Sequence, residues 1–201
     1  MRPGVLLLAA ALTGGCAATV KEVRDHPQQV RLERLLAEVL PATKYPHKHY
    51  WVRVADSGKD RIGLAVLPQR HIYIAQPIVE EADDAILRAL IAHAVSHHRL
   101  HHYTQRDLAE TGQKVAFKAG GQFVPGLSNA GHVGGPVTET LMGSPHEASG
   151  DRKTLTYLQR MEVPQEDFPR ALEFLADRDY AERIGRTTSR PNKLRSRAAR
   201  A

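Results

Sequence analysis

The feature that most constrains the fold is the stretch Pro77–His102, whose pattern predicts one long helix. Ile86, Leu90 and His93 recur at helical spacing on one face, and His97 extends that face by a further turn. Both histidines therefore lie on the apolar side of the helix. Such a helix has to pack against another layer of the protein and bury its two imidazoles there.

Shorter elements are predicted on both sides of this helix. A glycine-rich segment, 119–143, is expected to be a connection or a broken helix over the site. The order helix, short sheet and then helices predicts an α+β fold, mostly helical, with a small and mostly antiparallel sheet beside the long helix. The other predicted elements are helices at 30–40, 147–161 and 168–180, and strands at 50–54, 62–67 and 71–75.

The net charge of +6 is concentrated at the C-terminal end. Seven of the 28 basic residues and no acidic residue follow Glu182, so the rest of the chain carries 21 basic and 22 acidic residues. We therefore expect a solvated basic tail over 183–201, with contact to anionic lipid or RNA as the alternative. No nucleic acid partner is expected for the nearly neutral body.

The N-terminus has the pattern of an export signal. Arg2 precedes the short apolar run Val5–Leu12, and small residues then lead to Cys16, the sole cysteine. This arrangement resembles a bacterial lipobox, although Thr13 stands where leucine is usual. We expect a signal peptide over 1–16, a folded domain over 17–182, and a lipid anchor at Cys16 that holds the protein to a membrane in the periplasm. Ordinary cleavage, which would leave a soluble periplasmic protein, is the alternative.

Two histidines one helical turn apart can share one metal ion. His93 and His97 form such a pair, and Glu147, at the start of a predicted helix, is a candidate third ligand. Asp151 follows Glu147 by one turn and could orient a ligand histidine. The remaining histidines of the tract, at positions 98, 101 and 102, are expected at the exposed end of the helix, or alternatively in a second metal site.

Three stretches together resemble a known family. They are Leu67-Pro68 with His71–Ile74, the helix Leu87–His93, and Glu147-Ala148-Ser149-Gly150-Asp151. Over roughly residues 30–190 the chain resembles the HtpX-type zinc metallopeptidases, relatives of the CAAX prenyl endopeptidases and the Oma-type mitochondrial proteases. The resemblance implies a zincin-like metallopeptidase domain of the gluzincin type.

The resemblance also implies roles for residues. His93 and His97 would be zinc ligands, Glu147 the third ligand, and Asp151 the partner that orients a ligand histidine. The strand His71, Ile72, Tyr73 and Ile74 would be the sheet edge that binds a substrate peptide by strand addition.

Four positions depart from the family pattern. Ala94 replaces the glutamate of H-E-x-x-H, which acts as the general base. Gln69-Arg70 replaces the glycines of a turn, and Ser149-Gly150 replaces the residues that normally precede the aspartate. Arg190-Pro191 stands where a histidine and proline are common, and Arg190 could then stabilise an oxyanion.

These features predict an exported zinc metalloendopeptidase-like lipoprotein whose catalysis is impaired. We expect it to bind or act on unfolded or extended polypeptides of the cell envelope. One alternative is an active metalloendopeptidase with a substitute base such as Glu139. Another is a non-enzymatic metal-binding protein built on the histidine tract.

Overall fold

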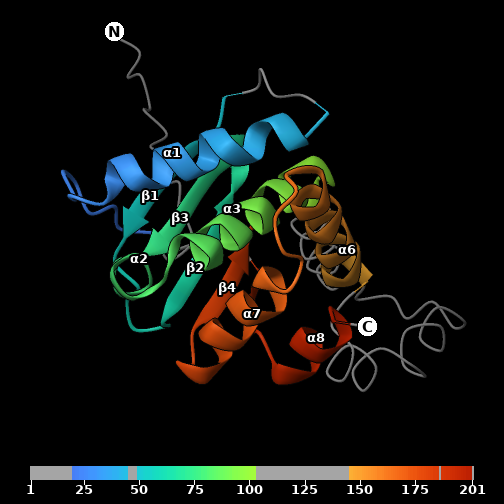
Figure 1. Ribbon diagram of the computed structural model, residues 1–201. Helices are drawn as coiled ribbons and strands as arrows, with labels where there is room; N and C mark the ends of the chain where they lie inside the picture. Colours follow the sequence, from blue (N-terminus) through green and yellow to red (C-terminus); the bar gives the residue numbers. More distant parts are fainter. Residues whose placement is uncertain (1–19, 45–48, 103–144, 186, 201) are drawn as a thin grey trace, which may run out of the picture.

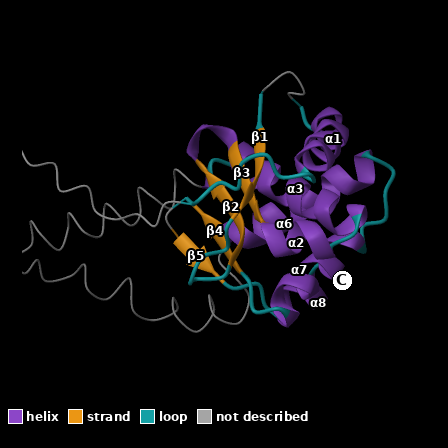
Figure 2. Cartoon of the chain, turned by 90° about the vertical axis from the view of Figure 1, so that its left-hand side faces the viewer, coloured by secondary structure: helices purple, strands orange, loops and turns teal. Residues whose placement is uncertain are grey.

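The computed structural model describes residues 20–44, 49–102, 145–185 and 187–200. Helices cover one face of a five-stranded sheet (Figures 1 and 2), which confirms the α+β class. The elements are α1 (Gln29–Val39), β1 (Trp51–Ala55), β2 (Ile62–Leu67), β3 (His71–Ala75), α2 (Gln76–Glu81), α3 (Asp84–Arg99), α6 (Pro145–Arg160), α7 (Asp167–Asp177), β4 (Ala181–Ile184), β5 (Thr187–Ser189) and α8 (Lys193–Ala198), with short 3-10 turns at Leu40–Ala42 and Pro68–Arg70. The glycine-rich segment 119–143 lies outside the described residues.

The strands lie in the order β1-β3-β2-β4-β5. β2 runs antiparallel to β3 and β4 antiparallel to β5, whereas β1 is parallel to β3 and β2 is parallel to β4. The sheet is therefore mixed rather than mostly antiparallel. The reason is that β3 inserts between β1 and β2, and that β4 joins β2 from the C-terminal end of the chain.

The strand predicted as the substrate edge, His71–Ile74, is not at an edge. It belongs to β3, which pairs with β1 on one side and β2 on the other. Its backbone groups are used by these two neighbours, so a peptide cannot add to this strand. In the turn before β3, Gln69 has φ 61° and Arg70 has φ 65°, the left-handed conformation that glycine adopts more easily.

The long predicted helix is divided into α2 and α3, with a break at Ala82 and Asp83. Asp83 has extended backbone angles, and its side chain accepts a hydrogen bond from the backbone N–H of Ile86 at 2.8 Å. This is the geometry of a helix N-cap. Asp83 therefore begins a second helix, α3, where the sequence pattern predicts one continuous helix from Pro77.

Helix α3 lies at the centre of the molecule (Figure 1). Twelve of its 16 residues are buried, among them every residue from Ala89 to His98. α1, α6, α7 and β2 pack around it. A helix that is enclosed on all sides places the His93–His97 pair inside the protein core.

Residues 183–201 do not form a separate basic tail. They include the end of β4, all of β5 and the helix α8, and the expected boundary at residue 183 falls within β4. Arg183 and Arg195 are buried. These arginines are accommodated because acidic groups and backbone oxygens of the fold accept their hydrogen bonds. None of the helices in the described ranges is long and apolar enough to cross a membrane.

Candidate functional site

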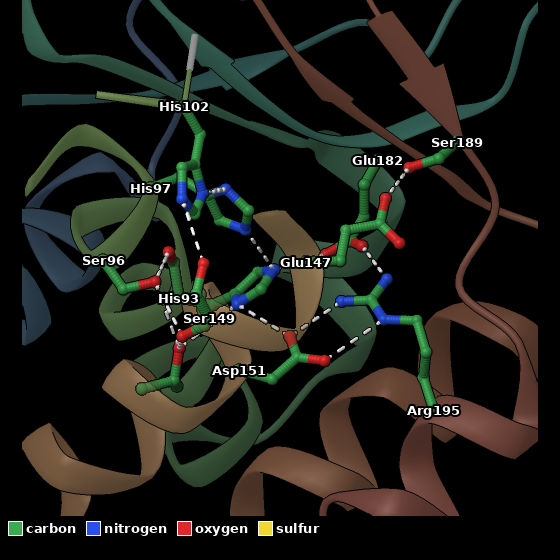
Figure 3. A network of polar contacts seen from close by, with 12 residues as sticks. His93, Ser96, His97, His102, Glu147, Ser149, Asp151, Glu182, Ser189 and Arg195 are labelled. Atoms are coloured by element: carbon green, nitrogen blue, oxygen red, sulfur yellow. Dashed lines mark hydrogen bonds and ion pairs between the residues drawn. The ribbon is translucent and has the colours of Figure 1, made fainter. Parts of the chain in front are cut away.

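His93 and His97 face each other in the interior of the protein (Figure 3). Both side chains are fully buried, and their Nε2 atoms lie 3.2 Å apart. Two nitrogens bound to one tetrahedral zinc at 2.0–2.1 Å would be separated by about 3.3 Å. The pair therefore has the spacing of two ligands on one ion.

Ala94, the residue between them in the motif, is also buried and belongs to the hydrophobic core. Its methyl group cannot accept a proton. The residue that would serve as general base in the complete motif is thus absent.

Helix α6 supplies the partners of one ring nitrogen of His93, Nδ1. This nitrogen lies 3.2 Å from Oγ1 of Thr154 and 3.7 Å from Oδ1 of Asp151. The structure therefore brings Asp151 beside the second nitrogen of His93, where the resemblance places it. Thr154 was not anticipated, because a threonine inside a helix has no distinctive sequence signal.

Glu147, also on α6, is buried at 6% exposure. Its Oε1 accepts a hydrogen bond of 2.9 Å from the hydroxyl of Ser189 on β5. Within the described ranges, no group of three or more His, Cys, Asp or Glu side chains is arranged to hold a metal ion. The role of Glu147 as third ligand stays a prediction.

A second carboxylate, that of Glu182 on β4, approaches the same histidine. The side chain is 1% exposed, and its Oε1 lies 3.2 Å from Nε2 of His93. The directions of the two groups do not make this contact a hydrogen bond, and in the described part of the chain Oε1 has no hydrogen-bond partner. An orphaned, buried carboxylate oxygen beside an imidazole nitrogen is a donor of the type that zinc binds, although these side chains are not arranged around an ion in the described ranges.

Arg195 on α8 holds this carboxylate in place. Its Nη1 donates to Oε2 of Glu182 at 2.7 Å, and its Nη2 donates to Oδ1 of Asp151 at 2.9 Å. Burial opposes the ionisation of Glu182, but the contacts with Arg195 and His93 outweigh burial and lower the pKa of Glu182. Burial alone would lower the pKa of Arg195, yet Glu182 and Asp151 raise it above its ordinary value. Both groups are charged at neutral pH.

Neither Glu182 nor Arg195 was predicted as a site residue from the sequence. Glu182 is the acid directly before the expected tail, and Arg195 was counted with its basic residues. Tyr180–Ile184 shows no alternation of apolar and polar residues, so no local pattern predicted this strand.

The other histidines of the tract are not all exposed. His98 and His102 are buried, whereas His101 is exposed. Nδ1 of His102 lies 2.9 Å from Nδ1 of His97, and its Nε2 lies 3.1 Å from Oγ of Ser149. His98 contacts the backbone oxygen of Leu67 at 2.7 Å, and burial lowers the pKa of His98 to about 4. His102 thus extends the site behind His97, while His98 is a structural contact.

Gly150 leaves the space that His97 occupies. A Cβ at this position would lie 2.7 Å from Nε2 of His97. The backbone oxygen of Gly150 also accepts a hydrogen bond from Ser96 at 3.0 Å. The glycine that departs from the family pattern is therefore fitted to the histidine beside it.

Arg190 does not reach the site. Its side chain is exposed, and its guanidinium donates to the carboxylate and to the backbone oxygen of Asp179. The expected role as an oxyanion stabiliser is therefore not supported. The arginine that reaches the histidines' surroundings is Arg195, five residues later.

Comparison with models of known protein families matches residues 26–195 to the model described as peptidase family M48. The match includes α3, α6 and β4, and it ends at Arg195. No curated protein matches the chain in sequence.

Proposed function

Because the chain belongs to peptidase family M48, we propose that it is an exported, zinc-binding metalloendopeptidase-like lipoprotein whose catalysis is impaired. It binds unfolded or extended polypeptides of the cell envelope. The observation that carries the proposal is the pair of buried imidazoles at ligand spacing, His93 and His97, beside a buried Ala94.

His93 and His97 would hold the zinc, together with a carboxylate of the same site. When bound, zinc lowers the pKa of its water and polarises a peptide carbonyl. Asp151 and Thr154 would orient His93 through its Nδ1, and Arg195 would keep the neighbouring carboxylates charged.

The loss of catalysis follows from position 94. A missing general acid–base group costs about 10²–10⁴-fold in rate. Arg195 cannot replace the glutamate, because its guanidinium is paired with Glu182 and Asp151 and, being already protonated, cannot accept a proton.

The decisive experiment restores the missing base. We expect Ala94→Glu to raise chelator-sensitive casein degradation by about 10²–10⁴-fold over the natural chain. Ala94→Gln is the matched control, since it adds similar volume without a proton acceptor. Zinc content and circular dichroism are measured on all three proteins, because position 94 is buried.

Two results would contradict the proposal. One is a natural chain that degrades casein as fast as Ala94→Glu, which would favour an active enzyme with a substitute base such as Glu139, a residue outside the described part. The other is purified protein that contains no zinc. A non-enzymatic histidine-tract protein is less well supported, since His98 and His102 make protein contacts.

Export and lipid anchoring at Cys16 are part of the proposal and are supported by sequence alone, because residues 1–19 lie outside the described ranges. Palmitate labelling tests the anchor. We expect the natural chain to be labelled and Cys16→Ser to be unlabelled. Equal labelling would leave ordinary cleavage and a soluble periplasmic protein.

The polypeptide-binding part of the proposal draws on β5. Among the described strands β5 lies at one end of the sheet and pairs only with β4. Its Ser189 contacts Glu147 of the site. An extended peptide that adds to β5 would therefore run next to the strand that contacts Glu147, whereas β3 offers no free edge.

A further inference from the structure

We propose that the sheet face opposite the helices rests on the membrane surface, with an aromatic row of Trp51, His71 and Tyr73 at the level of the lipid headgroups. This inference rests on the lipid anchor of the proposed function. It states which side of the protein the anchor turns toward the bilayer.

The two faces of the sheet differ in what covers them. Helices lie on one face (Figure 2), where every second strand residue is fully buried, as Val52 and Ile72 are. The residues between them point to the other face, which none of the described helices covers. Trp51 is 40% exposed there, and Arg53 and Tyr73 are half-buried. A surface of this kind is available to a partner.

The aromatic row runs across two neighbouring strands. Trp51 on β1 and His71 on β3 are register partners, and their rings stack with centroids 5.0 Å apart and planes 14° apart. His71 and Tyr73 stack in turn at 6.2 Å and 12°. Tryptophan and tyrosine are enriched at membrane–water interfaces, because each ring combines an apolar body with a polar group. Three nearly parallel rings on one sheet face suit a planar interface of that kind.

The described chain begins on the same face. Val20 lines one hollow together with Tyr73 and Arg183, and the strand register places both of these side chains on the uncovered face. The residues that follow Val20 are fixed to the sheet, since the backbone N–H of Val23 donates to the backbone oxygen of Val54 at 2.9 Å. The position of Val20 beside the face is therefore set by the fold.

A lipid on Cys16 would keep this face close to the bilayer. Val20 follows Cys16 by four residues, and four residues span at most about 14 Å when fully extended. The helices form a further layer about 10–12 Å thick on the opposite side of the sheet. The short connection therefore favours contact through the uncovered face over contact through the helices.

The charges beside the aromatic row are balanced. Arg53, the register partner of Tyr73, lies 3.5 Å from the carboxylate of Glu22 and 3.0 Å from that of Glu33. A surface with paired charges gains little from anionic headgroups. We therefore expect the rings to make the contact, and a zwitterionic lipid is a sufficient probe.

Trp51 is the sole tryptophan of the chain, so its fluorescence reports where the row lies. The lipid-bearing protein is purified from bacterial membranes and reconstituted into phosphatidylcholine vesicles whose acyl chains are brominated close to the headgroup. Unbrominated vesicles are the reference. We expect Trp51 to lose fluorescence in the brominated vesicles, and its emission to lie at shorter wavelength than in the unanchored Cys16→Ser protein.

The matched control moves the tryptophan to the helix layer. Leu194 on α8 is 48% exposed, so Leu194→Trp combined with Trp51→Phe places a single tryptophan on that side. We expect no loss of fluorescence at this position. Circular dichroism checks the fold of the control variant, and the measurement on Trp51 needs no substitution in the sheet.

The outcomes separate the inference from the anchor. Equal loss at both positions, or loss at neither, in protein that palmitate labelling shows to carry the lipid overturns the inference alone. Protein that carries no lipid and does not sediment with vesicles overturns the inference and the anchor of the proposed function together.

Discussion

At residue 150 the lack of a side chain determines where the second histidine of the pair lies. The imidazole of His97 fills the space that a Cβ would need, and Ser96 uses the backbone oxygen of the same glycine. At position 94 a small side chain has a different effect. Alanine stands there in place of the glutamate of the family pattern, so the carboxylate is missing. At single residues, this chain combines two histidines at ligand spacing with neighbours that differ from the family pattern.

The close fit at Gly150 predicts the outcome of adding one methyl group. Gly150→Ala should gain about 1 kcal/mol from helix propensity but lose about 1–3 kcal/mol by crowding His97. We expect a net loss of about 1 kcal/mol, measured as a lower urea midpoint with an unchanged slope.

The matched background is His97→Ala, in which the crowding is removed. There Gly150→Ala should stabilise the protein by about 1 kcal/mol. If Gly150→Ala is stabilising in the natural background as well, His97 moves aside without cost and its close packing against Gly150 is not a constraint.

At the scale of elements, Asp84 joins α3 to α1, alongside the ion pair of Arg88 on α3 with Glu38 on α1. Asp84 in the first turn of α3 accepts hydrogen bonds from Nε of Arg31 at 2.6 Å and from Nη2 of Arg34 at 2.5 Å. Its place also suits the positive end of the helix dipole. These contacts connect two helices whose positions set the depth of the histidine pair.

The contact predicts a pH-dependent contribution to stability. The hydrogen bonds from Arg34 and Arg31 lower the pKa of Asp84 below 3.8. A carboxyl whose pKa is lower in the folded state stabilises the protein above about pH 3.8 and loses that effect as pH falls through the folded value. We expect Asp84→Asn to cost about 0.5–1 kcal/mol at pH 7, because the groups are partly exposed.

The stability difference between Asp84→Asn and the natural chain should narrow as pH decreases from 5 to 3, and it should shrink in 1 M salt. Asp60→Asn, in an exposed turn, serves as the control and should differ little from the natural chain at any pH. A gap that widens on acidification would show that Asp84 is not the group responsible.

At the scale of the whole molecule, the C-terminal segment completes the interior. Arg195 on α8 reaches Glu182 on β4 and Asp151 on α6, so one side chain joins three separate elements. The family match extends to this same residue. The segment from β4 to α8 is thus part of the domain.

Removal of this guanidinium should therefore destabilise the entire fold. We expect Arg195→Met to cost about 3–5 kcal/mol, because it leaves buried carboxylates without their partner. Arg197→Met, an exposed position on the same helix, should change stability by less than about 0.5 kcal/mol. Equal urea midpoints for the two variants would favour the solvated tail that the charge pattern suggests.

Much of the element map could be predicted from the sequence. The strands Ile62–Leu67 and His71–Ala75 lie where their residue pattern places them, and α1 lies within one residue of its predicted bounds. The histidine pair was equally predictable, because an i, i+4 spacing on a helix is local geometry that needs no knowledge of the rest of the fold.

Tertiary structure alone decided the strand order and the surroundings of the histidines. β3 lies between β1 and β2, and Glu182 meets His93 only because a C-terminal strand pairs with β2. Local periodicity indicates whether a segment is a helix or a strand, but it does not indicate which distant segments pack together. The helix and its two histidines could therefore be predicted from the sequence, whereas long-range packing alone decides that Glu182 and Arg195 lie beside them.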